Sequence, residues 1–236
     1  MRPSGDTPLR LNKYLALCGL GSRRAVESLI RDGVVSVDGS VVTDLSRRIS
    51  AGESVRVMGR PAVPPRKHVH IMFNKPAGYL CSRTDPHHRP VIYDLLPPEM
   101  LTLHYVGRLD YPSRGLLLLT TDGDMTHRLL HPSFEVPRTY RVWTQDTLQA
   151  KDLQALREGV EIAPGQLAIP TTLNPTGDHL EITLKEGKKR EIRKMLEVLG
   201  HEVTDLQRIH FGGLHLGDLP EGKFRPLRAG ELATLP

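Results

Sequence analysis

Three carboxylates lie close together in the stretch VGRLDYPSRGLLLLTTDGD, residues 106–124, and each could act as a nucleophile or a metal ligand. Asp110 lies in a segment rich in turn-forming residues, and the apolar run Leu116–Leu119 follows it. A loop mounted on a rigid strand is a typical place for a catalytic group. An ordinary surface ion pair with a nearby arginine would explain the same pattern, so the spacing alone leaves the role of Asp110 open.

The other two carboxylates, Asp122 and Asp124, follow the apolar run in the pattern Asp-x-Asp-x-Thr. This pattern is typical of the nucleophile loop of haloacid-dehalogenase-like phosphatases, in which the first aspartate attacks phosphate beside Mg²⁺. That fold also needs a later acidic pair, and the downstream sequence contains neither Asp-Asp nor Gly-Asp-x-x-x-Asp after an apolar strand. We therefore predict a turn at Asp122 and Asp124 and keep the phosphatase as the weakest alternative.

The histidines raise the question of a metal site. His127, His131 and Glu135 stand at helical spacing, and two histidines four residues apart can bind zinc. Pro132 would end the helix before Glu135 could join that face. We therefore predict that this segment holds no metal.

The charge of the chain is unevenly distributed. Residues 1–67 contain 12 Lys and Arg against 6 Asp and Glu, whereas the rest of the chain contains 20 against 21. The first part thus carries a net charge of +6 and the second a net charge of −1. A small basic unit attached to a nearly neutral body indicates a polyanionic partner.

The N-terminal sequence predicts a compact module at residues 1–60. An apolar face at Leu11 and Leu15 predicts a helix that ends near Gly19, and Ser22 is a suitable N-cap for a second helix. Asp38-Gly39 between apolar residues predicts a hairpin, and SVRVMG predicts a closing strand. Arg23 and Arg24 would face outward in the first turn of the second helix, where we expect them to contact RNA.

A proline-rich linker is predicted at residues 61–67, and the body would occupy residues 68–236. VHIMF reads as a strand, followed by a turn at NKPAGY. KREIRKMLEVLG predicts an amphipathic helix with Ile192, Met195, Leu196 and Leu199 on one face. Strands and helices mix without a regular repeat, so we expect an α+β fold with a mainly antiparallel mixed sheet.

The composition is that of a globular protein, with 39% hydrophobic and 25% charged residues. No apolar run is long enough to span a bilayer, and the first residues lack the apolar core of a signal peptide. Cys18 and Cys81 are too few for a disulfide framework and are interpreted as small buried hydrophobic residues in a reducing compartment. We expect a cytoplasmic monomer without a membrane partner.

The first 60 residues resemble the S4-like (alpha-L) RNA-binding domain through the pattern RLNKYLAxxGLGSRRxxExLIRxGxVxVDG. The resemblance implies two helices and a small sheet that bind structured RNA through shape and phosphates. From about residue 68 onward the chain resembles the RsuA/RluB family of rRNA pseudouridine synthases. Four stretches carry this resemblance: FNKPAGYLCSRTDPHHRPVIYDLLP, VGRLDYPSRGLLLLTTDGDMTHRLLHPS, RTYRV, and LKEGKKREIRKMLEVLGHEVTDLQRIHFGGLHLGDL.

This resemblance implies a role for individual residues. Asp110 matches the catalytic aspartate, and Arg108 matches the arginine that fills the gap left by the flipped base. Tyr140 matches the tyrosine that packs on the target uracil, and Arg193 matches the basic residue that pairs with the aspartate. Further RNA contacts are expected at the remaining basic positions of the matched stretches: Lys75, Arg138, Lys188, Lys189 and Arg190.

Two positions depart from the family pattern. Ser113 replaces a common threonine, which keeps the hydroxyl group. Arg138 replaces a common lysine, which keeps the charge but changes its geometry, so the role of position 138 is open.

The implied reaction converts uridine to pseudouridine in ribosomal RNA. The uracil leaves C1′ through N1 and rejoins it through C5 without redox change or an outside group, so we expect that no cofactor is required. A paired base must first be flipped out of its helix. RPVIYDLLP and HPS favour the large-subunit (23S) branch over the small-subunit (16S) branch, with 23S rRNA or a pre-ribosomal particle as partner. The alternative is a non-enzymatic rRNA-binding or assembly factor, which would not need Asp110, Tyr140 and Arg193 together.

Overall fold

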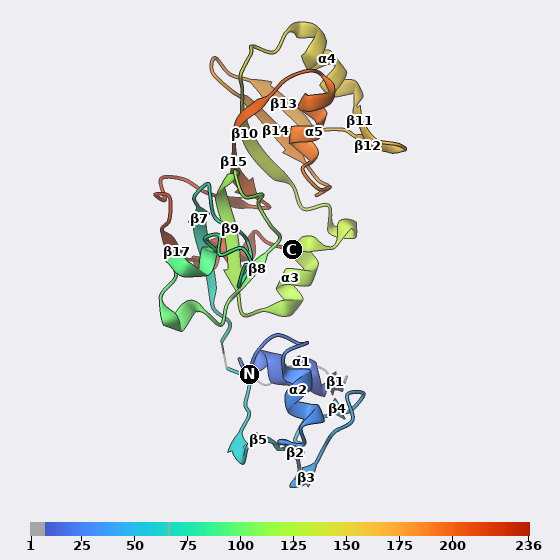
Figure 1. Ribbon diagram of the computed structural model, residues 1–236, viewed down its shortest axis with the longest axis vertical. Helices are drawn as coiled ribbons and strands as arrows, with labels where there is room; N and C mark the ends of the chain where they lie inside the picture. The colour runs from blue at the N-terminus through green and yellow to red at the C-terminus, as the bar shows by residue number, and fades with distance from the viewer. Residues whose placement is uncertain (1–7, 66) are drawn as a thin grey trace. The chain divides into compact units, whose positions relative to one another are not determined.

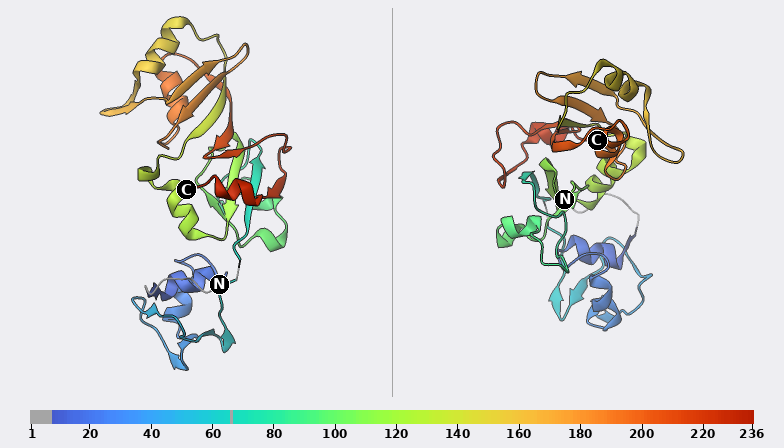
Figure 2. Two further views of the ribbon diagram at one scale, coloured as in Figure 1. Left: turned by 180° about the vertical axis from the view of Figure 1, so that it is seen from behind. Right: turned by 45° about the horizontal axis from the view of Figure 1, so that its top comes forward.

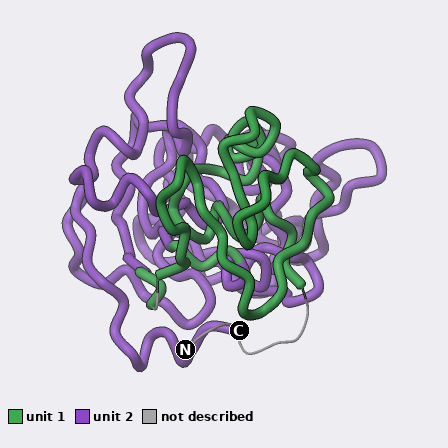
Figure 3. The backbone as a smooth tube through the Cα atoms, turned by 90° about the horizontal axis from the view of Figure 1, so that it is seen from below, with its two compact units in different colours: residues 1–69, 121–123 green, residues 70–120, 124–236 purple. Residues whose placement is uncertain are grey.

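The computed structural model describes residues 8–65 and 67–236. The chain divides into two compact units (Figure 3). The first consists of residues 1–69 with 121–123, and the second of residues 70–120 with 124–236.

The N-terminal unit contains two short helices and a small sheet, as predicted. Its elements are β1 (Leu9–Arg10), α1 (Leu11–Leu17), α2 (Val26–Arg31), β2 (Val35–Val37), β3 (Ser40–Val41), β4 (Arg48–Ile49), β5 (Val55–Val57) and β6 (Arg60–Pro61). The sheet order is β3-β2-β5-β6, and β1 pairs with β4. Asp38 and Gly39 have φ values of 48° and 84°, which is the left-handed geometry of a tight hairpin turn. Its core includes Leu11, Leu15, Val26 and Ile30.

The second helix begins later than predicted. Ser22 caps a separate turn, because its Oγ accepts a hydrogen bond of 3.1 Å from the Ala25 N–H, and α2 starts only at Val26. Arg23 and Arg24 lie in this turn and are exposed.

The start of the proline-rich stretch belongs to the N-terminal unit. β6 pairs with β5, Ala62 is buried in the same core, and its carbonyl oxygen accepts a hydrogen bond of 3.0 Å from the Tyr14 hydroxyl.

The second unit is built on a nine-stranded sheet (Figure 1). Its strands are β7 (His70–Lys75), β8 (His104–Val106), β9 (Arg114–Thr120), β10 (Arg138–Thr144), β13 (Thr172–Pro175), β14 (Leu180–Leu184), β15 (Val203–Phe211), β16 (Leu214–His215) and β17 (Phe224–Pro226). The main order is β13-β14-β10-β15-β9-β7-β17, with β8 on β9 and β16 on β15. The pair β9–β15 is parallel and the other pairs are antiparallel, which confirms the predicted α+β fold with a mainly antiparallel sheet.

The remaining elements cover this sheet. They are η1 (Ile92–Leu95), η2 (Pro98–Met100), α3 (Gly123–Leu130), η3 (Pro132–Phe134), α4 (Ala150–Glu158), the hairpin β11 (Val160–Ala163)–β12 (Gln166–Ala168), α5 (Glu191–Val198) and α6 (Ala229–Ala233). In the described ranges, none of the helices is both long and apolar enough to cross a bilayer.

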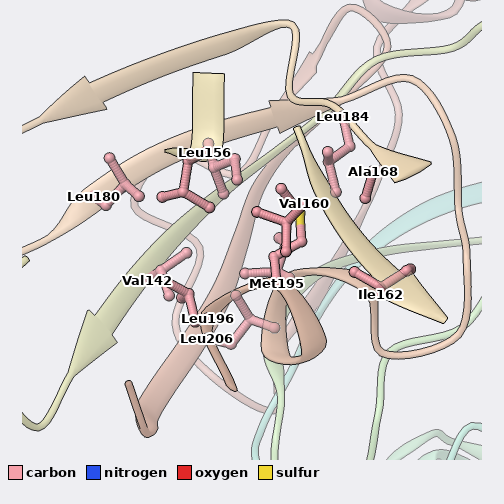
Figure 4. Close-up of a cluster of buried hydrophobic side chains, with 12 residues drawn as sticks. Val142, Leu156, Val160, Ile162, Ala168, Leu180, Leu184, Met195, Leu196 and Leu206 are labelled. Carbon is pink, nitrogen blue, oxygen red and sulfur yellow. The ribbon is translucent and has the colours of Figure 1, made fainter. Parts of the chain in front are cut away.

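Two hydrophobic clusters occupy one face of the sheet. The first is formed by α4, α5 and the strands β10 and β14, and Figure 4 shows Met195 and Leu196 of α5 within it. The second joins β7 and β9 to the segment around η1. A third cluster lies on the other face, with alternate residues of β9, and packs under α3. Leu232 of α6 packs against this cluster, and the view from behind in Figure 2 shows α6. The predicted apolar face of α5 is therefore confirmed as a core-forming face.

The Asp-x-Asp-x-Thr segment is not an isolated turn, which corrects the prediction. Gly123 starts α3 and Asp124 lies in its first turn, where a carboxylate interacts favourably with the helix dipole. His131 lies just beyond the end of α3, and Pro132 starts the 3-10 helix η3, so Glu135 does not continue the helical face.

Candidate active site

Asp110 lies in the loop 107–113, which connects β8 to β9. Lys75, the last residue of β7, holds this loop through hydrogen bonds. The Lys75 ammonium donates hydrogen bonds to the carbonyl oxygens of Ser113 at 2.7 Å, Pro76 at 3.0 Å, Asp110 at 3.3 Å and Tyr111 at 3.5 Å. Three of these four acceptors belong to the loop, so one buried cation fixes the backbone on both sides of Asp110.

Two more contacts close the same loop. The Ser113 N–H donates to the Asp110 carbonyl oxygen at 3.0 Å, and the Gly78 N–H donates to the Tyr111 carbonyl oxygen at 2.8 Å. Leu109 is buried, and its N–H donates to the Sγ of Cys81 at 3.4 Å. The loop is therefore preorganised, and the half-buried Asp110 has little backbone freedom.

The prediction of an RNA contact at Lys75 is wrong. Lys75 is 0% exposed, and its ammonium is used by carbonyl oxygens of the Asp110 loop and of Pro76. Burial lowers the pKa of Lys75 to about 8, although the Cys81 thiol and the Asp110 carboxylate act in the opposite direction. Its role in this structure is to hold the Asp110 loop.

Tyr140 reaches the same region from β10. Lys75 pairs with Gly115, Gly115 with Arg208, and Arg208 with Tyr140, so these residues form one row across β7, β9, β15 and β10. Two strand spacings separate Gly115 from Tyr140, or about 10 Å. Only Gly fits in this row beside β15, since a Cβ on Gly115 would lie 2.3 Å from the Arg208 carbonyl oxygen.

The side chain of Tyr140 lies where two hydrophobic clusters of the sheet meet. Among the described residues, Tyr140 alone packs against both the α4–α5 cluster and the η1 cluster. It is half-buried, so its ring lies at the boundary between the two clusters rather than inside either.

Arg193 comes from α5, on the other side of this boundary. Its Nη1 donates to the Val203 carbonyl oxygen at 3.0 Å, and its Nη2 donates to the Oγ of Ser113 at 3.5 Å. Ser113 is 1% exposed, so the hydroxyl kept at this position links the Asp110 loop to α5. Burial and the nearby Arg190 lower the pKa of Arg193, whereas the Asp110 carboxylate raises it.

The resemblance implied that Arg193 pairs with Asp110, and this pairing stays a prediction, although the Asp110 carboxylate acts on the pKa of Arg193. Within the described ranges, no ion pair within 4.0 Å joins the two side chains. The Arg193 guanidinium is engaged by the backbone of β15 and by Ser113 instead. One of its nitrogens, Nε, is buried without a hydrogen-bond partner.

Arg138 is also a structural residue, and its predicted RNA contact is wrong. It is 9% exposed, and its guanidinium donates to the carbonyl oxygens of Leu129, Lys185 and Glu186. Its charge also lies over the ring of Phe211, 5.2 Å from the ring centroid. Arg138 therefore ties β10 to α3 and to the basic loop 185–190.

The other predicted RNA contacts differ in accessibility. Arg108, Lys189 and Arg190 are exposed. Lys188 is half-buried, and its ammonium donates to the Leu167 carbonyl oxygen at 2.6 Å and pairs with Glu186 at 2.6 Å.

The sequence reasoning missed the buried Arg208. It is 2% exposed, and its Nε donates to the Leu116 carbonyl oxygen at 2.7 Å, close to where β9 and β15 run parallel. The alternation Leu206, Arg208 in a strand could have indicated an inward-facing arginine. The position of Lys75 could have been inferred in the same way, because Lys75 lies on the same face of β7 as Ile71 and Phe73.

These side chains can do carboxylate chemistry on a planar ligand. Asp110 supplies a fixed nucleophile or anion, Tyr140 a ring face with a polar end, and Arg193 a cation. Among the described residues, no group of three His, Cys, Asp or Glu side chains is arranged to hold a metal ion.

Comparison with known proteins assigns this site to a family. Residues 69–198 match the family described as RNA pseudouridylate synthase, and residues 9–55 match the S4 domain. The first match covers more than half of the chain. The chain belongs to the RNA pseudouridylate synthase family. It is therefore a pseudouridine synthase with an S4 domain, and neither the phosphatase nor the non-enzymatic alternative describes it.

Relatives of this pseudouridine synthase match it over nearly its whole length. An uncharacterized RNA pseudouridine synthase of Aquifex aeolicus is 38% identical, with 96% of this chain and 93% of the relative covered. The ribosomal large subunit pseudouridine synthase B of Bacillus subtilis is 32% identical, with 96% and 95% covered. A solved structure described as pseudouridylate synthase has a TM-score of 0.71 and 30% identity, with 96% of this chain and 99% of that chain covered.

Proposed function

We propose that this enzyme isomerises a specific uridine to pseudouridine in ribosomal RNA, with the large-subunit RNA as substrate. Relatives from Bacillus subtilis and Salmonella typhi, at 32% and 37% identity, are named as large-subunit pseudouridine synthases. The basic S4 unit fits a highly charged RNA partner. As the sequence led us to expect, we propose a monomer that acts in the cytoplasm.

Asp110 is proposed as the catalytic residue. The observation that carries this assignment is the set of Lys75 hydrogen bonds, which fixes the loop of Asp110 beside the row that contains Tyr140. A carboxylate so placed can attack C1′ or the base, or stabilise an oxocarbenium-like sugar. In each route the C1′–N1 bond breaks, a C1′–C5 bond forms, C5 loses its proton and N1 gains one.

The substrate base must be flipped out before Asp110 can reach it. We propose that Tyr140 packs on the flipped uracil and that Arg108, exposed in the same loop, occupies the vacated stack. Arg193 would stabilise negative charge at Asp110 or on the detached uracil from its anchored position. Lys189, Arg190, Arg23 and Arg24 are exposed and would contact phosphates.

The proposal is tested by treating unmodified 23S and 16S rRNA transcripts with the purified enzyme and mapping pseudouridine by carbodiimide-dependent primer extension. We expect one new stop in the 23S transcript. Modification of 16S rRNA alone would overturn the subunit assignment, and modification of neither transcript, naked or in ribosomal particles, would overturn rRNA as the substrate.

Replacing Arg193 separates its electrostatic role from a packing role. Arg193→Ala should lower kcat by about 10- to 100-fold with KM nearly unchanged, because the cation acts on charge that develops during the reaction. Arg193→Lys should retain more activity than Arg193→Ala. Single-turnover rates at saturating enzyme measure the difference. Equal rates for the lysine and alanine variants would contradict an electrostatic role.

The exposed arginines of the S4 unit should set part of the RNA affinity. The double variant Arg23→Ala, Arg24→Ala should bind rRNA more weakly, and its plot of log affinity against log salt should be shallower by about 0.9 for each lost phosphate contact. The matched control is Lys151→Ala, Arg157→Ala, which removes two exposed charges from α4. An unchanged salt slope in the first double variant would remove Arg23 and Arg24 from the interface.

A further inference from the structure

Three exposed rings form a ladder that begins within α3 and continues on the segment that joins α3 to β10, yellow-green in Figure 1. The rings of His127 and His131 lie 5.1 Å apart between centroids at 34°, and those of His131 and Phe134 lie 6.3 Å apart at 85°. All three residues are exposed, and Phe134 is 44% exposed. None of the roles assigned above uses this ring ladder.

The middle ring of the ladder, His131, is held by hydrogen bonds although all three rings are exposed. The Nδ1 of His131 lies 2.7 Å from the Oγ of Ser133 and accepts a hydrogen bond of 3.3 Å from the Ser133 N–H. Pro132 fixes the first position of η3, and Glu135 ends the turn with a φ of 45°. Rigid aromatic rings bind ligands with little loss of conformational freedom.

Cations lie near the ladder. Leu130, between His127 and His131 in the sequence, has its Cδ2 3.1 Å from the position that a Cβ on Gly107 would take, and the exposed Arg108 follows Gly107. Next to Phe134, the carboxylate of Glu135 pairs with Lys185 at 2.7 Å, at the start of the basic loop 185–190. The charge of Glu135 is therefore compensated, and the surface suits a polyanion.

We propose that the ring ladder stacks the unpaired bases of the RNA strand that flank the target uridine. This inference rests on the proposed function, because it needs RNA at the Asp110 loop. Exposed aromatic rings beside cations are a usual platform for single-stranded nucleic acid, since every base has a π face that can stack on a ring while the cations neutralise its phosphates. The ladder extends the site from the reacting nucleotide to its neighbours on the same strand.

The test compares two single strands of about ten nucleotides, an oligoadenylate and an abasic strand with the same number of phosphates. Phe134→Ala in the full-length protein should weaken oligoadenylate binding about tenfold and leave the abasic strand unaffected. Phe134→Tyr should restore binding, whereas Phe134→Leu should not, because it keeps apolar surface without a π face. Ile169→Ala, which truncates another exposed apolar side chain of the same unit, is the control.

Several results would overturn the ladder. One is wild-type affinity of Phe134→Ala for oligoadenylate, and another is an equal loss on both strands. A third is altered self-association or protein binding by Phe134→Ala with unchanged RNA affinity, which would assign the surface to a protein. If the wild type forms no pseudouridine in rRNA but Phe134→Ala still loses oligoadenylate affinity, the substrate proposal fails and the ladder stands.

Discussion

Asp110→Asn should abolish pseudouridine formation, with a rate at least about 1,000-fold below that of the wild type. Asparagine has nearly the same shape, but its amide is neither an anion nor an effective nucleophile. The contacts that hold the loop use the carbonyl oxygen of Asp110, which accepts from Lys75 at 3.3 Å and from Ser113 at 3.0 Å, so the substitution leaves them in place. RNA affinity should stay within about twofold of the wild-type value, because phosphate contacts elsewhere dominate binding.

Two matched controls accompany this variant. Asp122→Asn and Asp124→Asn make the same chemical change at the start of α3, where the expected loss is about 0.3–1 kcal/mol of helix–dipole interaction and none of the activity. The measurement is pseudouridine per rRNA fragment, with filter binding on the same samples. Normal product from Asp110→Asn would falsify the proposed mechanism, and an equal loss of product from Asp122→Asn with the fold intact would show that the effect is not specific to Asp110.

The fold was largely predictable because its elements follow simple periodicities. The mainly apolar run VHIMF located β7, helical spacing located α5, and Asp38-Gly39 located the hairpin between β2 and β3. The ends of the helices were less predictable. Serine is favoured both before a helix and before a separate turn, so Ser22 alone could not show that α2 begins only at Val26.

The site was predictable in its residues but not in their contacts. Lys75 and Arg138 look like RNA-binding residues in the sequence, yet both are buried and donate to backbone carbonyls. Which carbonyls lack a partner depends on where strands end and diverge, and this is a tertiary property. The same limit applies to Arg193, whose guanidinium is engaged by Val203 and Ser113 rather than by Asp110.

Lys75→Met should lower kcat by about 100-fold, because a displacement of about 1 Å at a catalytic group can have that effect. Methionine fills a similar volume but leaves the carbonyl oxygens of Ser113, Asp110 and Tyr111 without this donor. The carbonyl oxygens of Asp110 and Tyr111 keep their donors from the Ser113 and Gly78 N–H groups, so the lost hydrogen bonds should reduce the free energy of unfolding by about 2–4 kcal/mol, after allowance for the relief of a buried charge. Lys151→Met, on the exposed face of α4, is the matched control.

The pKa of Lys75, about 8 in the folded enzyme against an ordinary value of 10.5, adds a pH signature. Above pH 8 the neutral amine has two N–H donors in place of three, so wild-type kcat should fall as the pH rises through 8. The stability contribution has the opposite sign, because between pH 8 and 10.5 the unfolded chain binds more protons at Lys75 than the folded chain. The free energy of unfolding of the wild type should therefore rise relative to Lys75→Met over this range, while the alkaline fall in kcat should be missing from the variant. If the variant keeps wild-type kcat and the same alkaline fall, Lys75 does not hold the catalytic loop.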